Sequence, residues 1–482
     1  MKINIKKMNV KSAILTLTAL VLTVGCADIE LEENPPSLLN PNTFFTTESE
    51  FEAAITGAMR PLYAGYEGWD YGYPIILCSG AEDVRSDADI FANLDRLNPN
   101  SQELTIAGIW KVLYQSISNV NAIIGNLGNA ENISEERLGE LEGQAKFIRA
   151  LDFFFLVRWF GEVQLTTFEN QGDVENLPQA TVEEIYASII ADLKDAEAKL
   201  PDTFEQRGRP TKGAAKALLA KVYLTMTGWP LKDASKYAEA RDKAKEVMDM
   251  GIYSLEANFN DLWLEANKLT NAEFIFAFYG SIAADGISGS HMHIASRHWG
   301  NGEGGWGDFY SEDRFFNAFP DGPRKDATFT SVFADGTSWE DAGVQPHMAK
   351  YRDAGDTVND DGEGFNVVLR YADVLLMYAE AANMAEGGPS QAALDAINEV
   401  RQRAGLTPLS SGMSQSDFDG AVIEERNWEL AFEANRWFDL VRKEMVIEVN
   451  QDLHPNVSEN NRLLPKPAAQ LIPGILEQNP GY

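Results

Sequence analysis

Cysteine is almost absent from this chain of 482 residues, which contains only Cys26 and Cys78. If Cys26 carries a lipid, Cys78 has no partner within the chain, and an internal disulfide is excluded for the mature protein. No His or Cys lies close to Cys78 in the sequence. We therefore interpret Cys78 as a small buried hydrophobic residue.

Positive charge is scarce as well. The chain has 40 Lys and Arg against 73 Asp and Glu, which gives a formal net charge of −33 at pH 7. Nucleic acid is excluded as a partner, because its phosphates must be neutralised by Lys and Arg. So much acid is typical of a solvated, non-adhesive surface. With 44% hydrophobic residues, the chain can still bury a large core.

Motifs of the common catalytic classes are missing. The chain has no phosphate-binding loop and no GxSxG, HExxH or CxxC pattern. Glu82, Asp83 and Asp87 lie on one short stretch, which is poorly suited to act from both sides of a sugar ring, so we interpret them as hydrogen-bonding or capping residues. The H-x-H spacing of His291 and His293 lacks the Cys or carboxylate that would complete a zinc site. We predict a protein that is not an enzyme and has no cofactor.

The N-terminus has the features of a leader. Several lysines precede an apolar run at residues 13–24 that is too short to span a bilayer. We predict a signal peptide over residues 1–25, which resembles the bacterial lipoprotein signal although Thr23 and Val24 depart from its usual pattern. In such signals the cysteine after the cleavage point, here Cys26, becomes the lipidated N-terminus. We expect residues 26–45 to form an acidic tether, either as a plain disordered linker or as a segment that resembles the surface-export signal of Bacteroidetes lipoproteins.

Helical periodicity is abundant. Between Leu369 and Gly405, two apolar stripes at helical spacing are separated by Gly387, Gly388 and Pro389. Ser390 is a suitable N-cap for the second helix, and Gly405 stands where a C′ glycine is expected. Two helices of this length, rich in alanine where they would touch, predict a close-packed antiparallel hairpin.

The same design recurs upstream. Apolar stripes at residues 215–226 and 237–247 predict a second hairpin, and looser stripes at 148–155 and 185–196 predict a third. The last of these helices begins at Thr181 and Glu184, which have the spacing of a capping box. Hairpins of about 35 residues are typical of a tetratricopeptide-like array. The predicted fold is therefore all-α, with tetratricopeptide-like helical hairpin repeats and loop-rich, partly irregular insertions.

One long stretch interrupts the helical pattern. Residues 281–365 are dense in Gly, Asp and aromatic residues and have few helical stripes. They follow the segment FIFAFYG after Glu273, which predicts a strand. A stretch of this length is unusual as a mere linker between helices, so we expect the ligand-binding region here.

Aromatic side chains beside glycines are the candidate ligand contacts. Sugar binding requires flat apolar faces for the C–H side of a pyranose and hydrogen-bond donors for its hydroxyls. We predict that Trp299 and Trp306 line one exposed platform, with His291, His298 and Arg297 as donors at its rim. Ordinary hydrogen bonding within the protein is the alternative for this His and Arg group. Secondary candidates are Trp69, Tyr71, Tyr73 and Trp339.

The segment from Phe418 to Arg442 mixes charged residues with large apolar ones. We interpret these charges as an ion-pair network that ties helices together, rather than as catalytic carboxylates. The charged residues are Glu425, Arg426, Glu429, Glu433, Arg436, Asp439 and Arg442.

Several segments together resemble the SusD/RagB family of nutrient-binding lipoproteins. They are GQAKFIRALDFFFLVRWFGEV (143–163), GRPTKGAAKALLAKVYL (208–224), LRYADVLLMYAEA (369–381), INEVRQRAGL (397–406), EERNWELAFEANRWFDLVR (424–442) and the terminal QNPGY (478–482). The resemblance implies a SusD-like domain over residues 46–482 and a lipid-anchored protein of the cell outer membrane that faces the exterior. It also implies a SusC-like TonB-dependent transporter as partner. Members of the family capture glycans, or sometimes peptides, and are not enzymes.

We therefore expect a surface lipoprotein that captures oligosaccharide and delivers it to the transporter. The alternatives are capture of a peptide or another nutrient by the same type of complex, an all-α glycoside hydrolase, and a scaffold that binds only protein. A hydrolase would need two opposed carboxylates, and a protein-binding scaffold would lack an exposed aromatic platform. The matching segments are mainly scaffold, so the resemblance transfers no binding residue.

Overall fold

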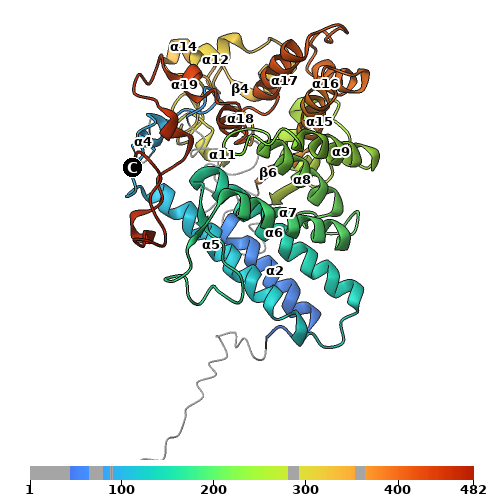
Figure 1. Ribbon diagram of the computed structural model, residues 1–482. Coiled ribbons are helices and arrows are strands. Elements are labelled where there is room, and N and C mark those ends of the chain that lie inside the picture. The colour runs from blue at the N-terminus through green and yellow to red at the C-terminus, as the bar shows by residue number, and fades with distance from the viewer. Residues whose placement is uncertain (1–43, 64–79, 87, 90, 280–291, 353–363) are drawn as a thin grey trace, which may run out of the picture. The chain divides into compact units, whose positions relative to one another are not determined.

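The computed structural model describes residues 44–63, 80–86, 88–89, 91–279, 292–352 and 364–482. Most of these residues are helical, and their strands form three short pairs (Figure 1). Residues Phe45–Tyr482 form one compact unit. Within the described ranges, no helix is both long and apolar enough to cross a membrane. The predicted all-α fold with irregular insertions is confirmed.

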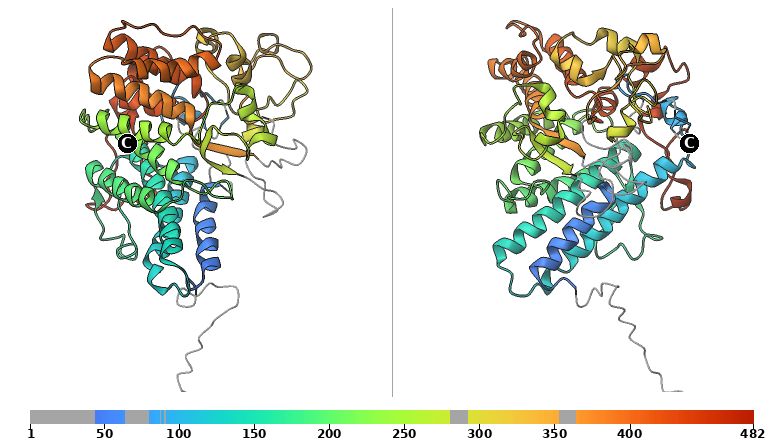
Figure 2. Two further views of the ribbon diagram at one scale, coloured as in Figure 1. Left: turned by 90° about the vertical axis from the view of Figure 1, so that its right-hand side faces the viewer. Right: turned by 180° about the vertical axis from the view of Figure 1, so that it is seen from behind.

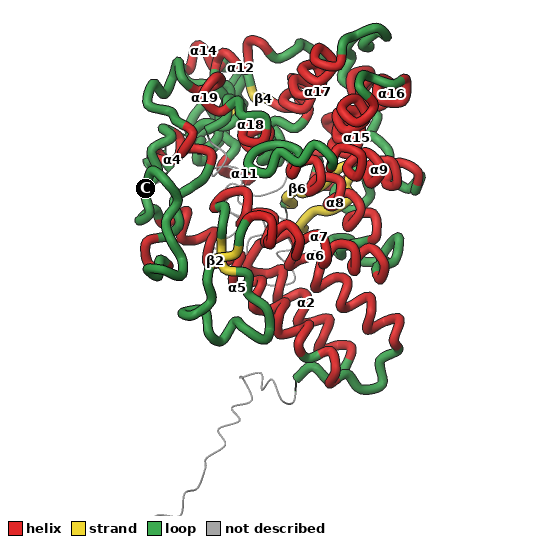
Figure 3. The backbone as a smooth tube through the Cα atoms, in the orientation of Figure 1, coloured by secondary structure: helices red, strands yellow, loops and turns green. Residues whose placement is uncertain are grey.

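The long helices pack one against the next in chain order (Figure 3). Helix α2 packs on α5, and contacts then run from α5 through α6, α7 and α8 to α9. Helix α15 packs on α9, α16 and α17, so the three predicted hairpins, α6–α7, α8–α9 and α15–α16, are confirmed. The bounds are α2 Glu48–Tyr63, α5 Leu104–Gly125, α6 Glu135–Phe160, α7 Val182–Lys199, α8 Lys212–Met226, α9 Lys236–Asp249, α15 Tyr371–Glu386, α16 Gln391–Arg403 and α17 Gln415–Glu429.

Local sequence signals decide where these helices begin and end. The Thr181 hydroxyl accepts the backbone N–H of Glu184 at 3.2 Å, and the Glu184 carboxylate accepts the N–H of Thr181 at 2.9 Å, which completes the predicted capping box. The Ser390 hydroxyl caps α16. Gly387 and Gly405 adopt φ of +78° and +77° just beyond α15 and α16, a conformation that glycine enters without a Cβ clash.

The strand expected after Glu273 is present as β3 (Phe274–Tyr279). It pairs antiparallel with β6 (Phe365–Arg370), so that Tyr279 lies opposite Phe365. Strand β6 was not expected, because its partner lies about ninety residues earlier in the chain. The other pairs are β1 (Val163–Gln164) with β2 (Gln179–Ala180) and β4 (Phe329–Thr330) with β5 (His347–Met348).

Short helices and loops make up residues 292–352, which gather beside the C-terminal segments at the upper left of Figure 1. Phe329 joins the two regions, because its ring contacts Phe315 and Phe319 on one side and Phe432 on the other, at centroid distances of 5.0–6.0 Å. The short helices of residues 292–352 are α11 Met292–Ala295, α12 Asp313–Ala318, α13 Pro323–Thr328 and α14 Trp339–Ala342. The short helices elsewhere are α4 Ala92–Asp95, α18 Arg436–Arg442 and α19 Val446–Asn450.

Candidate functional site

A tight loop after α11 presents Trp299 to solvent. The N–H groups of Trp306 and Gly307 donate to the carbonyls of Ile294 (2.9 Å) and Arg297 (2.8 Å), which ties the two sides of the loop together. A Cβ on Gly305 would lie 2.2 Å from the Arg297 carbonyl oxygen, so only glycine permits this approach. The Trp299 side chain is 74% exposed at the tip.

A buried aromatic layer supports Trp299. The His298 ring stacks on Phe333 at a centroid distance of 4.8 Å and lies 5.2 Å from the ring of His347 and 5.3 Å from the ring of Trp299. His298 is only 3% exposed. The structure places the His298 ring in the packing beside the Trp299 indole, and not at the rim where it was predicted to supply a donor.

Both buried histidines are held by hydrogen bonds to the backbone. The Gly300 N–H donates to Nδ1 of His298 at 3.3 Å, which leaves Nδ1 as the acceptor in this ring. Nδ1 of His347 lies 2.8 Å from the Gln345 carbonyl and must donate to it. Burial lowers the pKa of His347 to about 4, so this imidazole is neutral at physiological pH. The aromatic layer therefore behaves as packing rather than as a charged site.

An open hollow of about 500 Å³ adjoins the base of the Trp299 loop. Arg297 and Arg352 are on its wall, together with Thr330 and Val332. Arg297 donates from Nη2 to the Arg352 carbonyl at 2.7 Å, and Arg352 forms an ion pair with Glu303 at 2.5 Å. Two oriented guanidinium groups beside an exposed indole can offer donors to hydroxyl or carboxylate groups of a ligand.

The other predicted tryptophans that the structure describes are less exposed to solvent than Trp299. Trp306 is half-buried at the base of the loop. Trp339 is half-buried in α14, where its ring meets Phe316 edge-on at 5.6 Å. Trp299 and Trp306 therefore differ in exposure, and Trp299 is the indole that faces solvent. The predicted contacts and anchor that lie outside the described residues are His291, Trp69, Tyr71, Tyr73 and Cys26.

Sequence reasoning missed Arg352, Phe333 and His347 in this region. Each is more than thirty residues away from Trp299 in sequence and reaches it only through the fold. The one available signal was their position inside the predicted ligand-binding stretch. Their residue types alone gave no reason to single them out.

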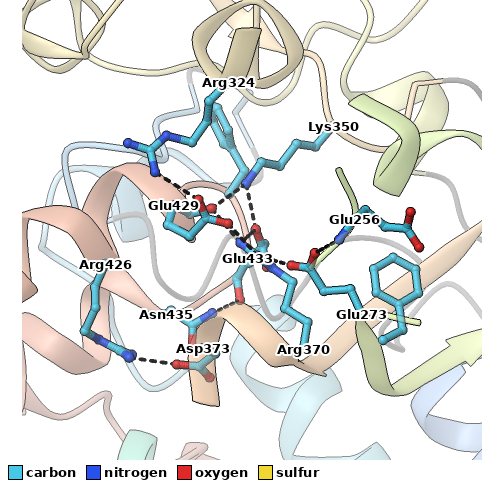
Figure 4. Close-up of polar contacts among 12 residues, drawn as sticks. Glu256, Glu273, Arg324, Lys350, Arg370, Asp373, Arg426, Glu429, Glu433 and Asn435 are labelled. Carbon is cyan, nitrogen blue, oxygen red and sulfur yellow. Dashed lines mark hydrogen bonds and ion pairs between the residues drawn. The ribbon is translucent and has the colours of Figure 1, made fainter. Parts of the chain in front are cut away.

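The carboxylates of residues 418–442 are engaged in buried ion pairs. Figure 4 shows Arg370 among Glu273, Glu429 and Glu433, with contacts of 2.6–2.8 Å. The predicted network within residues 418–442 is confirmed by the pairs Arg324–Glu425, Arg426–Asp439, Arg442–Asp439 and Arg436–Glu82.

The acidic pair near the start of the described chain is structural too. Glu82 accepts from Arg436 at 2.6 Å and from Asn427 at 3.0 Å, while Asp83 accepts the N–H of Phe432 at 3.0 Å. The hydrogen-bonding role predicted for Glu82 and Asp83 is confirmed, whereas Asp87 lies outside the described residues. Within the part of the chain that the structure describes, no three His, Cys, Asp or Glu residues gather as metal ligands.

Two family models match this chain. Residues 333–472 match the SusD family, and residues 31–224 match a family described as starch-binding and associating with the outer membrane. The chain is 29% identical to SusD-like protein P2 of Formosa agariphila, over 97% of this chain and 99% of that protein. It is 26% identical to a SusD-like protein of Bacteroides ovatus, over 90% of this chain and 82% of that protein.

Solved structures agree. A SusD superfamily protein from Parabacteroides distasonis superposes with a TM-score of 0.78 at 28% identity, covering 90% of this chain and 99% of that one. A laminarin-binding SusD-like protein superposes with a TM-score of 0.77 at 26% identity, covering 91% of this chain and all of that one (100%). Together the family models and these relatives span the helical array and the loop-rich region alike, and over both regions the chain matches the SusD/RagB family.

Proposed function

We propose that this protein captures oligosaccharide at the cell surface and delivers it to a SusC-like TonB-dependent transporter of the outer membrane. The observation that carries the proposal is Trp299, whose indole is 74% exposed on a loop tied by backbone hydrogen bonds. Exposed apolar area costs free energy in water, and a flat indole suits the C–H face of a pyranose. The loop therefore has the character of a preformed stacking surface.

Polar groups beside the indole complete the proposed site. Arg297 and Arg352 hold guanidinium groups at the adjoining hollow, where they can donate to sugar hydroxyls. Trp306 and Trp339 stay in the proposal as partly exposed contacts. The other predicted contacts, which lie outside the described residues, remain part of it as well: His291, Trp69, Tyr71 and Tyr73.

Support for a glycan as ligand comes from relatives. One solved relative is a laminarin-binding SusD-like protein, and one family model is described as starch-binding. Both descriptions are of binding rather than turnover. The ion-paired state of Glu425, Glu429, Glu433 and Asp439 is in keeping with capture without cleavage, because carboxylates held by arginines are poor general acids.

Replacing the exposed indole tests this proposal. We expect Trp299→Ala to weaken glycan binding about tenfold, since one stacking contact contributes about 1–1.5 kcal/mol. Isothermal titration calorimetry with a glycan that binds in a polysaccharide screen measures the effect. The melting temperature should hardly change, because the side chain is 74% exposed.

Leu104→Ala is the matched control, because Leu104 is an 86% exposed apolar residue at the start of α5. Unchanged affinity in the Trp299 variant would contradict the proposed site. Retention of peptides, with no glycan retained in the screen, would favour the alternative of peptide capture.

The membrane anchor is a separate part of the proposal. We expect Cys26→Ala to shift the protein from the outer-membrane fraction to unprocessed or soluble periplasmic forms, because stable attachment requires more than one acyl chain. Cys78→Ala is the control, since it removes the other cysteine of the chain. Fractionation with metabolic labelling by a palmitate analogue measures the result. Labelled, membrane-bound Cys26→Ala protein would refute lipidation at this residue.

A further inference from the structure

A second hollow, of about 380 Å³, lies between α2, residues 206–209 and the end of β3. We call it the arginine groove, because Arg60, Arg207 and Arg209 are on its wall. Among the described residues that line it there is no Asp or Glu. In the left view of Figure 2, the upper end of α2 (blue) lies just below the β3–β6 pair. Three cations on a wall whose described residues include no acid stand out on a chain with a formal charge of −33.

Two of the three arginines are not neutralised by described residues. Arg209 forms an ion pair with Glu52 and donates to Gln144 at 3.2 Å. Arg207 makes a single long contact, from Nη2 to the Asn271 carbonyl at 3.4 Å, and neither Arg207 nor Arg60 has a carboxylate partner among the described residues. Both side chains belong to exposed residues. Elsewhere in the described chain most guanidinium groups are paired, as in the Arg370 cluster.

The backbone at Gly208 passes close to an aromatic ring of the groove. Gly208 has φ of +88°, and a Cβ there would lie 3.2 Å from Cδ2 of Tyr279. Arg207 and Arg209, the neighbours of Gly208 in the chain, line the same groove as Tyr279. Burial raises the pKa of Tyr279 to about 12, and the charge of nearby Arg207 opposes that shift. This effect of Arg207 on the pKa of Tyr279 indicates that the guanidinium group lies close to the phenol.

An anionic group is the ligand chemistry that this arrangement favours. Unpaired guanidinium groups bind carboxylate and sulfate oxygens through charge-assisted, often bidentate, hydrogen bonds. An acidic surface otherwise repels polyanions, so binding of an anion would have to occur at a local patch such as this one. Gln206 and Thr56 on the same wall add hydrogen-bonding groups of the kind that contact sugar hydroxyls.

We propose that the arginine groove binds the anionic substituent of an acidic saccharide, through Arg60 and Arg207 beside Tyr279. The inference rests on the proposed glycan capture and adds the chemical class of the ligand. The substituent is a sulfate ester or the carboxylate of a uronic acid, which present similar oxygens to a guanidinium. The groove therefore selects charged glycans over neutral ones with the same backbone.

Charge-matched glycan pairs test this inference on the mature chain. The pairs are dextran sulfate with dextran, carrageenan with its desulfated form, and polygalacturonate with its methyl ester. Affinity electrophoresis and calorimetry at 50 and 300 mM NaCl measure binding. We expect the charged member of at least one pair to bind about tenfold more tightly at low salt and to lose that advantage at high salt. The sulfated and uronate pairs separate the two sources of the anion.

Variants then assign the effect to the groove. Arg60→Gln and Arg207→Gln should each reduce affinity for the charged member about tenfold and leave any binding of the neutral member unchanged. The lysine variants Arg60→Lys and Arg207→Lys should restore part of the loss. Arg96→Gln is the matched control, because Arg96 is also exposed and without a carboxylate partner among the described residues, yet does not line the groove. Unchanged melting temperatures would separate loss of binding from unfolding.

The outcomes distinguish this inference from the proposed function. Equal binding of charged and neutral members, or full affinity in the two glutamine variants, overturns the inference and leaves glycan capture in place. Binding of no glycan, charged or neutral, overturns both. If only Trp299→Ala lost all glycan binding, capture would be assigned to the Trp299 loop. If the arginine variants lost binding of charged glycans alone, the arginine groove would be supported as the site that binds the anionic substituent.

Discussion

Arg370→Met is expected to lower the free energy of unfolding by about 3–5 kcal/mol, because it removes one partner from a buried ion-pair cluster. Arg370 is 1% exposed at the end of β6 and contacts Glu273, Glu429 and Glu433 at 2.6–2.8 Å (Figure 4). Its Nη2 also donates to the Glu429 carbonyl at 2.6 Å. Methionine fills similar volume, so the loss reflects carboxylates left without their cation rather than a cavity.

The pH dependence of this effect has a definite sign. Burial alone would raise the pKa of Glu429, but Arg403, Arg370 and Arg324 hold it well below its usual range. A carboxylate with a lowered pKa in the folded state stabilises the fold fully above its unfolded pKa, about 4.3, and loses that contribution as pH falls. The advantage of wild type over Arg370→Met should therefore be largest at pH 7 and smaller at pH 4.

Urea unfolding followed by circular dichroism at pH 4 and pH 7 measures both effects. Lys245→Met is the control, because Lys245 forms an exposed ion pair with Asp249 in α9, and such pairs contribute about 0–1 kcal/mol. Equal transition midpoints for wild type and Arg370→Met would show that the cluster adds little to stability. A changed slope would instead indicate that unfolding is no longer two-state.

Asp152→Asn is expected to have the opposite effect and to stabilise the protein at pH 7, because it removes a buried carboxyl that must stay protonated in the fold. Asp152 lies in α6, fully buried, and neither carboxylate oxygen has a hydrogen-bond partner among the described residues. Ser116 in α5 is also buried, and its hydroxyl opposes the rise of the Asp152 pKa that burial causes. Burial raises the pKa of Asp152 well above its usual range, so the folded protein retains a proton that the unfolded chain releases.

The sign of the pH dependence follows from that proton. A carboxyl with a raised folded-state pKa makes the fold less stable as pH rises from the unfolded pKa, about 3.9, toward the folded one. Asparagine has no such titration, so the advantage of Asp152→Asn should grow with pH over this range. Thermal unfolding at pH 5, 6, 7 and 8 measures the trend.

Asp192→Asn provides a matched control at the neighbouring α6–α7 interface. Asp192 is also buried, but it accepts two hydrogen bonds of 2.8 Å from Arg149. Its replacement should destabilise the protein, since a buried ion pair loses its negative partner. A stabilising Asp192→Asn, or an Asp152→Asn whose advantage over wild type is no larger at pH 8 than at pH 5, would contradict this account of the two buried carboxylates.

The helical hairpins could be predicted because their signals are local. The stripe of Ala372, Leu375, Ala379 and Ala382 is buried throughout, and the glycines at 387 and 405 end α15 and α16. Contacts at positions i, i+3 and i+4, together with caps, depend on residues within one or two helical turns. The same locality explains the capping box at Thr181.

Pairings between distant segments could not be predicted in the same way. The charges of residues 418–442 indicated a network, but Glu273, Arg324, Lys350 and Arg370, which complete it, come from four other segments. Strand β6 was missed for the same reason, since a strand needs a partner and β3 lies far upstream. Periodicity shows which face of an element is apolar, not which distant element will cover it.

The sequence by itself determined the all-α class, the three hairpins and the absence of catalytic motifs. Only the tertiary structure decided that His298 is packed beneath Trp299, that Arg352 faces the same hollow as Arg297, and that Arg60 and Arg207 share one groove. The physical reason is that helix and turn preferences act over a few residues. Burial and charge partnership depend on where the whole chain places its distant segments.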